Sequence, residues 1–441
     1  MIQKGSLSDR NTATNIQNEA PGPVTIPRVG LTIEIIDSQC RKGRHTNSDT
    51  MKAKLPIWTA RWLKSIDEVD RRQWDRLARP LATCLLEWQW LHDLETSGSI
   101  APRHGWQPCH LTLWEGASLV AAAPLYIKNH SEGEFVFDHW WAQLAREYGV
   151  AYYPKLVGMS PVTPAVGYRM LAAEDLDAAA VMNAMVPVID QLCADLRIAS
   201  CHFNFVDETW FGRHSAKAFT AWRHQSFLWR NPGYASFEDY LQRFKSGQRR
   251  NIRRERAQME RMGIRIQALA GDAINPELAP VMYRYYLRTN DQYGPWAARY
   301  LNADFFERIF QTYRHRLLVI AAYGPSGRKH PLALSMLLIK NRHLIGRYWG
   351  SAKHIKDLHF NMCFYAPIQW AIENGIRTFD PGAGSAHKIY RGFEAVSNTS
   401  LHRLYDPRLK LLFGNLIDAV NRMETENIAA LNRKLPFAAT C

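Results

Sequence analysis

The sequence predicts an α/β (α+β) protein with two domains, each built on a mixed sheet flanked by helices, behind a disordered N-terminal tail. Three observations support this prediction. The chain has 441 residues, which is more than one domain of about 100–200 residues holds. Segments that alternate apolar and polar residues are interleaved with segments of helical spacing along most of the chain. Residues 1–54 are instead rich in Ser, Thr, Asn, Pro and Gly, a composition typical of disorder.

The first domain is expected at residues 55–232. Strand and helix patterns follow one another there, which favours an α/β domain. The expected elements are a helical region over 58–90, paired strands over 111–114 and 119–127 around Glu115-Gly116, a helix over 178–197 and a strand over 201–206.

The second domain is expected at residues 233–410, followed by a C-terminal helix and tail at 411–441. Pro367 predicts a kink or a late start in one helix, because proline lacks the backbone N–H that a helix needs. The expected elements are a basic helical stretch over 237–262, helices over 276–290, 303–313 and 358–374, and strands over 264–269, 317–322, 332–339, 343–349 and 377–380.

Composition limits the classes of partner and site. The formal net charge of +14 points to anionic partners: nucleic acid, phosphorylated small molecules or membrane headgroups. Seven cysteines without a CxxC pair, and histidines without metal-ligand spacing, predict no disulfide framework, no metal and a reducing cytoplasm. No apolar run is long enough for a transmembrane helix, which leaves peripheral membrane contact open.

The first candidate site is the basic segment 243–256, in which seven of fourteen residues are Lys or Arg. Arg249, Arg250, Arg253 and Arg254 stand at i, i+1, i+4 and i+5, which places two adjacent rows of guanidinium groups on one helical face. Guanidinium groups bind phosphate with two hydrogen bonds. We therefore expect Arg249, Arg250 and Arg253 to hold the phosphate groups of a ligand or co-substrate. The alternative is a solvated basic surface.

The second candidate is the segment HLIGRYWGS at 343–351, a predicted strand that ends in glycine before a polar linker. Ligands of open α/β sheets bind beyond the carboxyl ends of strands, where free backbone N–H groups hold phosphates or an oxyanion. Arg347, Tyr348 and Trp349 are therefore candidates for substrate contact. The alternative is a buried strand in which Arg347 is paired with a carboxylate.

The third candidate is the segment FDPGAGSAHKIYRGF at 379–393. A strand delivers Asp380 to a turn whose glycines permit backbone close to a ligand. A lysine there can donate to a developing oxyanion, and a histidine can relay a proton near neutral pH. The alternative is an exposed loop of mixed charge. The basic and aromatic residues that follow the turn are His387, Lys388, Tyr390 and Arg391, of which Tyr390 and Arg391 are candidates for substrate contact.

A fourth cluster combines DHWW at 138–141 with YYPK at 152–155. Aromatic side chains and a lysine around a proline-containing loop suit a substrate groove. Trp141, Tyr153 and Lys155 are the candidates for substrate contact in this cluster. The alternative is that the tryptophans pack in the core.

Taken together, these segments resemble the FemAB-like family of predicted N-acyltransferases, over about residues 58–406. The resemblance implies transfer of an acyl group to an amine, and it brings His359 into the substrate site. The blocks that carry it are Asp138–Trp141, Tyr152–Leu156, Pro161–Arg169, Ser246–Arg256, Gly346–Gly350, Leu358–Tyr365 and His387–Phe393.

A wider similarity is to the Fem-type aminoacyltransferases of peptidoglycan synthesis. These carry a basic RRNI-type helix and an FKxGF-like stretch, which 249–252 and 388–393 resemble here. The similarity implies a pair of GNAT-like domains with a groove between them, and places stabilisation of the oxyanion on Lys388. It implies no tightly bound cofactor, with acyl-CoA or aminoacyl-tRNA as co-substrate.

One residue departs from the family pattern. Typical members have an acidic residue before the histidine of the late block, whereas this chain has Ala386. His387 is then the nearest candidate base. Three functions stay open: an N-acyltransferase that uses a donor such as acyl-CoA, which we prefer; a tRNA-dependent aminoacyltransferase of peptidoglycan type; and a non-catalytic anion-binding protein on the same scaffold.

Overall fold

The computed structural model describes residues 25–26, 31–34, 57–210, 218–294, 297–325, 330–382, 384 and 386–438. The prediction of a disordered tail over 1–54 therefore falls mostly outside the described residues. Within that tail, β1 (Leu31–Glu34) pairs antiparallel with β2 (Ile57–Leu63).

The remaining strands extend over the whole chain. They are β3 (Trp106–Pro108), β4 (His110–Glu115), β5 (Ser118–Ala123), β6 (Tyr126–Lys128), β7 (Lys155–Gly158), β8 (Leu171–Ala172), β9 (Ser200–Phe203), β10 (Thr220–Arg230), β11 (Arg265–Ala270), β12 (Leu317–Tyr323), β13 (Ala333–Lys340), β14 (His343–Ser351), β15 (Thr378–Asp380) and β16 (Glu394–Leu404). They form a 5-stranded sheet, β1-β2-β4-β5-β8, and an 11-stranded sheet, β11-β12-β13-β14-β15-β10-β16-β9-β7-β6-β3.

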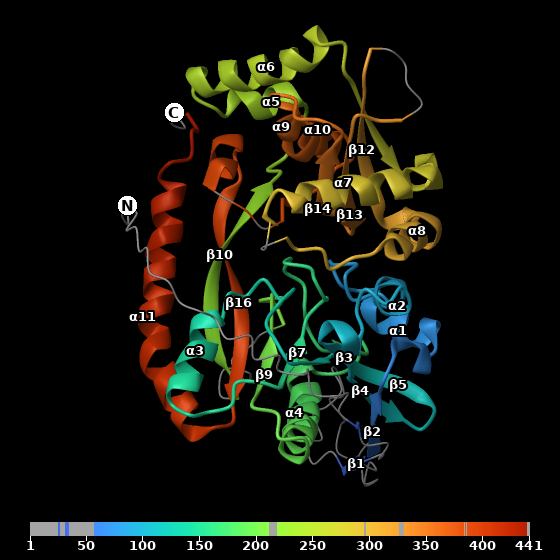
Figure 1. Cartoon of the computed structure of the whole chain (residues 1–441), viewed down its shortest axis with the longest axis vertical. Coiled ribbons are helices and arrows are strands. Elements are labelled where there is room, and N and C mark those ends of the chain that lie inside the picture. Colours follow the sequence, from blue (N-terminus) through green and yellow to red (C-terminus); the bar gives the residue numbers. More distant parts are fainter. Residues whose placement is uncertain are drawn as a thin grey trace, which may run out of the picture.

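Helices flank both sheets (Figure 1). They are α1 (Arg71–Ala78), α2 (Trp88–Thr96), α3 (His139–Glu147), α4 (Ala178–Asp195), α5 (Phe237–Gln242), α6 (Ser246–Arg261), α7 (Ala279–Asp291), α8 (Ala303–Thr312), α9 (Leu358–Phe360), α10 (Ala366–Glu373) and α11 (Pro407–Asn432), with a π-helical turn at Asn361–Tyr365. Side-chain caps start several of them: Asp177 accepts from the N–H of Ala180, and Asn302 from that of Phe305.

Most of the predicted elements are present, and one region was assigned wrongly. The helical region expected over 58–90 begins with a strand, β2, in which Trp58, Ala60 and Trp62 are buried. That alternation has a period of two, so it marks a strand with one face in the core. Helices α1 and α2 occupy only 71–78 and 88–96 of the same region.

The two halves of the chain exchange their last strands. β10 is the last strand before the predicted boundary at 232/233, yet it pairs with β15 of the C-terminal half. β16, the last strand of the chain, pairs with β9 of the N-terminal half. Each half also contains one parallel pair, β7 with β9 and β14 with β15. The predicted α/β class, with mixed sheets flanked by helices, is therefore confirmed, and the exchange joins the halves through one sheet.

Helix α11 covers the edge of β10 that β15 leaves open. β15 pairs with β10 only at Trp229 and Arg230. Further along the same strand, the Asn421 side chain accepts from the N–H of Arg223 at 2.8 Å and donates to the carbonyl of Ala221 at 2.9 Å. One amide side chain therefore supplies hydrogen-bond partners to two backbone groups on this otherwise unpaired edge of β10.

β15 ends after a short parallel contact with β14, and the turn that follows it stays against Gly346 of β14. The register ends at Ile345↔Asp380, although β14 continues to Ser351. β14 also carries a bulge at Arg347, because Met336 pairs with Tyr348 while the next residue of β13 pairs with Gly346. Bulges redirect side chains and often lie next to active sites. This edge of β14 therefore has no strand partner in β15 from residue 346 onward.

Candidate active site

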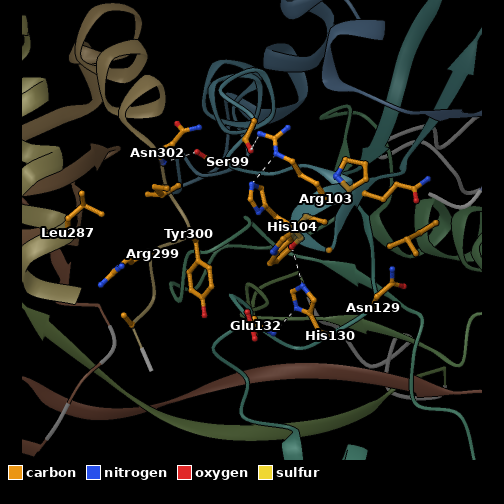
Figure 2. A pocket seen from close by; sticks show the side chains of 18 of the residues that line it. Ser99, Arg103, His104, Asn129, His130, Glu132, Leu287, Arg299, Tyr300 and Asn302 are labelled. Carbon is orange, nitrogen blue, oxygen red and sulfur yellow. Dashed lines mark hydrogen bonds between the residues drawn. The ribbon is translucent and has the colours of Figure 1, made fainter. Parts of the chain in front are cut away.

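A groove runs between the N-terminal and C-terminal halves. It consists of two cavities that share Tyr300 and Leu301. The wide cavity, of about 1080 Å³, lies between 98–107 with 127–132 on one side and 283–302 on the other. Figure 2 shows Tyr300 and Arg299 on one side and His104, His130 and Glu132 on the other. The narrow cavity, of about 260 Å³, continues to β14 and Gly382.

Hydrogen bonds across the groove hold its two walls together at the outer end. The backbone N–H of Asn302 donates to Ser99 Oγ at 3.2 Å, and Asn302 Nδ2 donates to the carbonyl of Ser97 at 2.6 Å. On the N-terminal wall, His130 Nε2 lies 3.1 Å from the carbonyl oxygen of His104. Each of these hydrogen bonds joins a side chain to a backbone group, and together they hold the outer end of the groove in the folded protein.

The inner end of the groove lies just beyond the end of β15, at Pro381 and Gly382. Asp380 accepts from the N–H of Gly382 at 2.8 Å, which closes a tight turn. Gly382 has a φ of 75°, and a Cβ built there would lie 2.9 Å from the carbonyl oxygen of Gly346. Only glycine therefore fits at this position without movement of the neighbouring backbone. The turn places Gly382 in the wall of the narrow cavity.

Lys388 lies directly behind this wall. Its side chain is buried, and Nζ donates to the carbonyl oxygen of Gly382 at 2.6 Å. Burial lowers the pKa of Lys388 to about 8, and the nearby Asp380 carboxylate partly opposes that shift. Burial also raises the pKa of the Asp380 carboxyl group. The hydrogen bond from the N–H of Gly382 and the positive charges of Lys388 and Arg347 lower this pKa, but they do not cancel the effect of burial. The site thus holds an acid and a base whose pKa values burial brings closer together.

A strip of rings leads from the narrow cavity to the late block. Trp349, a cavity residue, has its ring centroid 4.5 Å from that of His359, which lies 6.0 Å from the ring of His387. Burial lowers the pKa of His359 to about 4 and also lowers that of His387, so both imidazoles are neutral at pH 7. The π-helical turn beside them precedes Pro367, where the sequence predicted a kink.

Arg391 and Tyr390 connect the late block to helix α6. The Arg391 guanidinium is buried, lies 3.2 Å from both carboxylate oxygens of Glu255, and stacks 3.5 Å over the ring of Phe360. The carbonyl of Tyr390 accepts from Gln248 at 2.7 Å, while the Tyr390 ring is exposed. Arg391, expected to bind substrate, is therefore occupied by a buried ion pair that fastens α6 to this turn.

The arginines of α6 lie outside the groove. Arg249 donates to Gln242 at 2.6 Å, and Arg253 forms an ion pair with Glu238 of α5. Helix α5 thus supplies an acidic partner to the basic face of α6. Arg250 and Arg254 are exposed. None of the four lines either cavity of the groove.

The fourth predicted cluster lies in the polar core of the N-terminal half. Lys155 is fully buried, and its Nζ contacts Asp138 at 2.6 Å, Glu134 at 2.9 Å and Ser131 at 2.8 Å. Trp141 packs 4.3 Å from the ring of Phe413, centroid to centroid. The Tyr153 hydroxyl bonds Ser131 at 2.7 Å. These contacts leave Trp141, Tyr153 and Lys155 outside the groove, so the alternative of core packing describes them better.

Arg347, Tyr348 and Trp349 line the inner end of the groove, and Lys388 contacts Gly382 in the wall beside them. Arg347 donates to the carbonyl of Val162 at 2.7 Å, across the two halves, rather than to a carboxylate. Sequence reasoning missed Asp380 and Tyr300 as site residues. The signal for Asp380 was present, since it ends a strand before a glycine turn, whereas Tyr300 lies in an irregular segment that carries no motif.

The described part of the chain has neither a candidate metal site nor a candidate membrane-spanning helix. There, no group of three or more His, Cys, Asp or Glu side chains could hold a metal ion. Across the same residues, no helix is both long enough and apolar enough to cross a membrane.

Comparison with known proteins places the chain in a family. The model of the FemAB-like family, described as peptidoglycan biosynthesis/recognition, matches residues 65–439. This match confirms the family predicted from the sequence blocks, and with it the general class of acyl- or aminoacyltransferase. No curated protein matches the sequence.

Among solved structures, similar folds include FemX, with 10% identity, 78% of this chain and 98% of that chain covered and a TM-score of 0.49. The structure of L-PGS from Bacillus licheniformis shares 10% identity over 84% of this chain and 98% of that chain, with a TM-score of 0.45. A tandem GNAT protein from the clavulanic acid biosynthesis pathway shares 12% identity over 79% and 99%, with a TM-score of 0.39. Similarities this distant say nothing about the substrates of this chain.

Proposed function

Because the chain belongs to the FemAB-like family, we propose that it transfers an acyl group from an activated donor to an amine at the inner end of the groove. One observation carries the proposal: the buried ammonium of Lys388 lies behind Gly382, which is in the wall of the narrow cavity just beyond the end of β15. A positive charge shielded from water at the end of a substrate-sized groove suits a reaction in which an oxygen becomes negative.

The proposed reaction is an acyl transfer in two steps. The amine nitrogen attacks the carbonyl carbon of the donor, a C–N bond forms, and the carbonyl oxygen becomes an oxyanion. The oxyanion then collapses, and the bond from carbon to the leaving sulfur or oxygen breaks. The amine loses one proton to a base, and the leaving group takes up one proton. The charge of Lys388 stabilises the oxyanion, a role worth about 10²–10³-fold in rate.

We place the first proton acceptor at Asp380. This carboxylate borders the turn that forms the groove wall, and its raised pKa makes it a better base than an ordinary aspartate. His387, the base expected from the sequence, is neutral and so able to accept a proton, but it packs against His359 and Phe364. His387 is therefore the second candidate for the base. The rings of His359 and Trp349 lie between it and the narrow cavity.

The donor is proposed to be acyl-CoA, held along the groove with its reactive end at Arg347 and Trp349. No tightly bound cofactor or metal enters the proposal. A cytoplasmic location fits this donor and the five free cysteines among the described residues.

A second candidate donor is aminoacyl-tRNA. It is favoured by the exposed arginines of α6. This helix contacts the turn that carries Lys388, because the Gln248 side chain donates to the carbonyl of Tyr390. Neutralised phosphates would make binding of tRNA fall steeply with salt. A gel shift with bulk tRNA at 50 and 200 mM salt separates the two donors, because binding of acyl-CoA in the groove requires no such slope.

The direct test is turnover. The purified protein is incubated with a panel of acyl-CoA thioesters and primary amines, thiol release is followed, and the amide product is identified by mass spectrometry. We expect thiol release that depends on the amine and falls at least about 100-fold in Lys388→Met. An enzyme with Lys388→Met that folds normally and retains full turnover would overturn the role of Lys388.

A further inference from the structure

Aromatic side chains from both halves of the chain line the narrow cavity of the groove. Its volume of about 260 Å³ equals roughly nine water molecules at about 30 Å³ each, which suits one small molecule rather than a peptide chain. The rings of Tyr286 and Tyr348 pack with centroids 5.2 Å apart, and Phe135 meets Tyr300 at 6.2 Å. This lining favours a ligand with an aromatic part. The aromatic residues in it are Phe135, Tyr286, Tyr293, Tyr300, Tyr348 and Trp349.

Arg347 is the one charged residue among the described residues that line the narrow cavity. Its Nη2 atom donates to the carbonyl of Val162 at 2.7 Å and to the Tyr348 hydroxyl at 2.8 Å. Both acceptors are neutral, so they orient the guanidinium without pairing its charge. Its Nη1 atom has no acceptor among the described residues and, unlike Nε, is not enclosed by protein. Two charged N–H groups therefore remain for a ligand.

The charges around Arg347 favour an anionic ligand. Asp380 is the nearby acidic group, and burial raises its pKa while the charges of Lys388 and Arg347 oppose that shift. One carboxyl group thus faces two positive groups. Among the described residues, no Asp or Glu lines the narrow cavity. A carboxylate brought by the ligand would therefore supply the charged partner that Arg347 lacks.

A carboxylate bound to Arg347 would also position a neighbouring amine. Pro381 and Gly382 line the same cavity as Arg347, and Lys388 donates to the Gly382 carbonyl from behind the wall. In an α-amino acid, the amine and the carboxylate are attached to the same carbon atom. The nitrogen is then held inside the cavity beside the wall where the oxyanion is proposed to form, which is the arrangement that acyl transfer requires.

We propose that the acceptor is a free α-amino acid with an aromatic side chain. Its carboxylate binds Arg347 and the hydroxyl of Tyr348, and its ring packs among the aromatic residues of the narrow cavity. The α-nitrogen attacks the carbonyl carbon of the acyl thioester, a C–N bond forms and the bond from carbon to sulfur breaks. The neutral amine loses one proton and the leaving thiolate takes up one, so the products are an N-acyl amino acid and a thiol.

This inference rests on the proposed function for its chemistry, but binding of the amino acid is measurable without any donor. The experiment is calorimetric titration of the full chain with L-phenylalanine, compared with L-phenylalaninamide and L-alanine. The amide keeps the ring and the amine but lacks the carboxylate, whereas alanine lacks the ring. We expect saturable binding of phenylalanine, and binding at least about tenfold weaker for each of the other two.

Arg347→Met should weaken phenylalanine binding at least about tenfold and should affect the amide less, because the amide carries no negative charge. Arg72→Met on α1 is the matched control, since it removes the same charge from an exposed residue outside both cavities. Thermal melting separates a lost site from a lost fold. Where Arg347→Met is unstable, Tyr293→Ala tests the same cavity: its exposed ring can be removed without opening the core, and phenylalanine binding should weaken more than alanine binding.

Three results overturn the inference: no saturable phenylalanine binding by the unmodified chain, equal binding of phenylalanine and its amide, or phenylalanine binding by Arg347→Met that equals that of Arg72→Met. Failure of the proposed function looks different, because phenylalanine would still bind in a way that depends on Arg347 while no acyl-CoA yields an amide. Formation of N-acylphenylalanine from acyl-CoA and phenylalanine, identified by mass spectrometry and reduced in Arg347→Met, supports both.

Discussion

The Nζ atom of Lys388 lies 2.6 Å from the carbonyl oxygen of Gly382, so a buried charge is held against the wall of the groove by the same turn that Asp380 closes. This contact joins the lysine predicted from the sequence to the glycine turn of the same segment.

The pH dependence of turnover should report the charge of Lys388. Its pKa is lowered to about 8 by burial, so the charge is present below that pH and is lost as the pH rises through it. We expect kcat to fall above about pH 8. Lys388→Arg should be slower at neutral pH but should lack this basic limb, because a guanidinium stays protonated there.

The control for that pH profile is His387→Gln, which should keep the basic limb whatever its effect on the rate. A basic limb that is unchanged in Lys388→Arg would assign the titration to another group, such as the attacking amine.

Gly382→Ala should destabilise the fold more than Gly375→Ala. Both glycines have positive φ, 75° and 63°, so alanine is strained at either position by about 1–2 kcal/mol. Only at Gly382 does the added Cβ also meet a neighbour, the carbonyl oxygen of Gly346 at 2.9 Å. The free energy of unfolding in urea measures both losses. Equal losses would show that the backbone at Gly346 moves away from the added Cβ without a measurable cost in stability.

Glu255→Gln should be strongly destabilising. It leaves the Arg391 guanidinium buried without its carboxylate, which typically costs about 3–5 kcal/mol. The matched control is Glu238→Gln, which breaks the exposed pair with Arg253 and should cost no more than about 1 kcal/mol. Urea unfolding measures both losses. Similar losses in the two variants would mean that Arg391 finds another partner or reaches water.

Stability should fall as the pH drops below about 6.5, the usual pKa of histidine. Burial depresses the pKa of His202 and His402 far below that value, and that of His224 to about 4. The unfolded chain therefore takes up protons that the folded chain refuses, so stability present above pH 6.5 is lost below it. Each imidazole contributes a slope of up to about 1.4 kcal/mol per pH unit.

Urea unfolding at pH 7.5, 6.5, 5.5 and 4.5 measures this loss. His224→Gln should reduce the slope between pH 6.5 and 4.5, whereas substitution of the exposed His104 should leave it unchanged. The same slope in His224→Gln and in the unmodified chain would mean that the folded protein accepts this proton after all.

Strong local patterns made much of the C-terminal half predictable. The strands expected over 317–322, 332–339 and 343–349 correspond to β12, β13 and β14, because they are apolar runs separated by turns. The longest strands, β10 and β16, were not predicted. Their sequences TAWRHQSFLWR and EAVSNTSLHRL mix polar and apolar residues, and each is stabilised by pairing with the other across the chain.

In the candidate site, too, some residues were predictable from local sequence and others were not. Residues 347–349 and Lys388 were predicted from their segments. Residues 347–349 line one end of the groove, and Lys388 contacts the wall there through Gly382. Lys155 and Trp141 were predicted with equal reason, yet they lie in the core. A lysine that lines a groove and a lysine paired inside the protein look alike in a sequence, because what distinguishes them is the position of carboxylates from distant segments, here Glu134 and Asp138.

The sequence by itself determined the family, the α/β class and the chemical character of the late block, since these depend on residue types at short spacing. Only the tertiary structure decided which of those residues share a cavity. Strand exchange between the halves, the parallel pairing of β14 with β15 and the turn at Gly382 bring together segments far apart in the chain. Local periodicity carries no information about such contacts, because they depend on how the whole sheet is assembled.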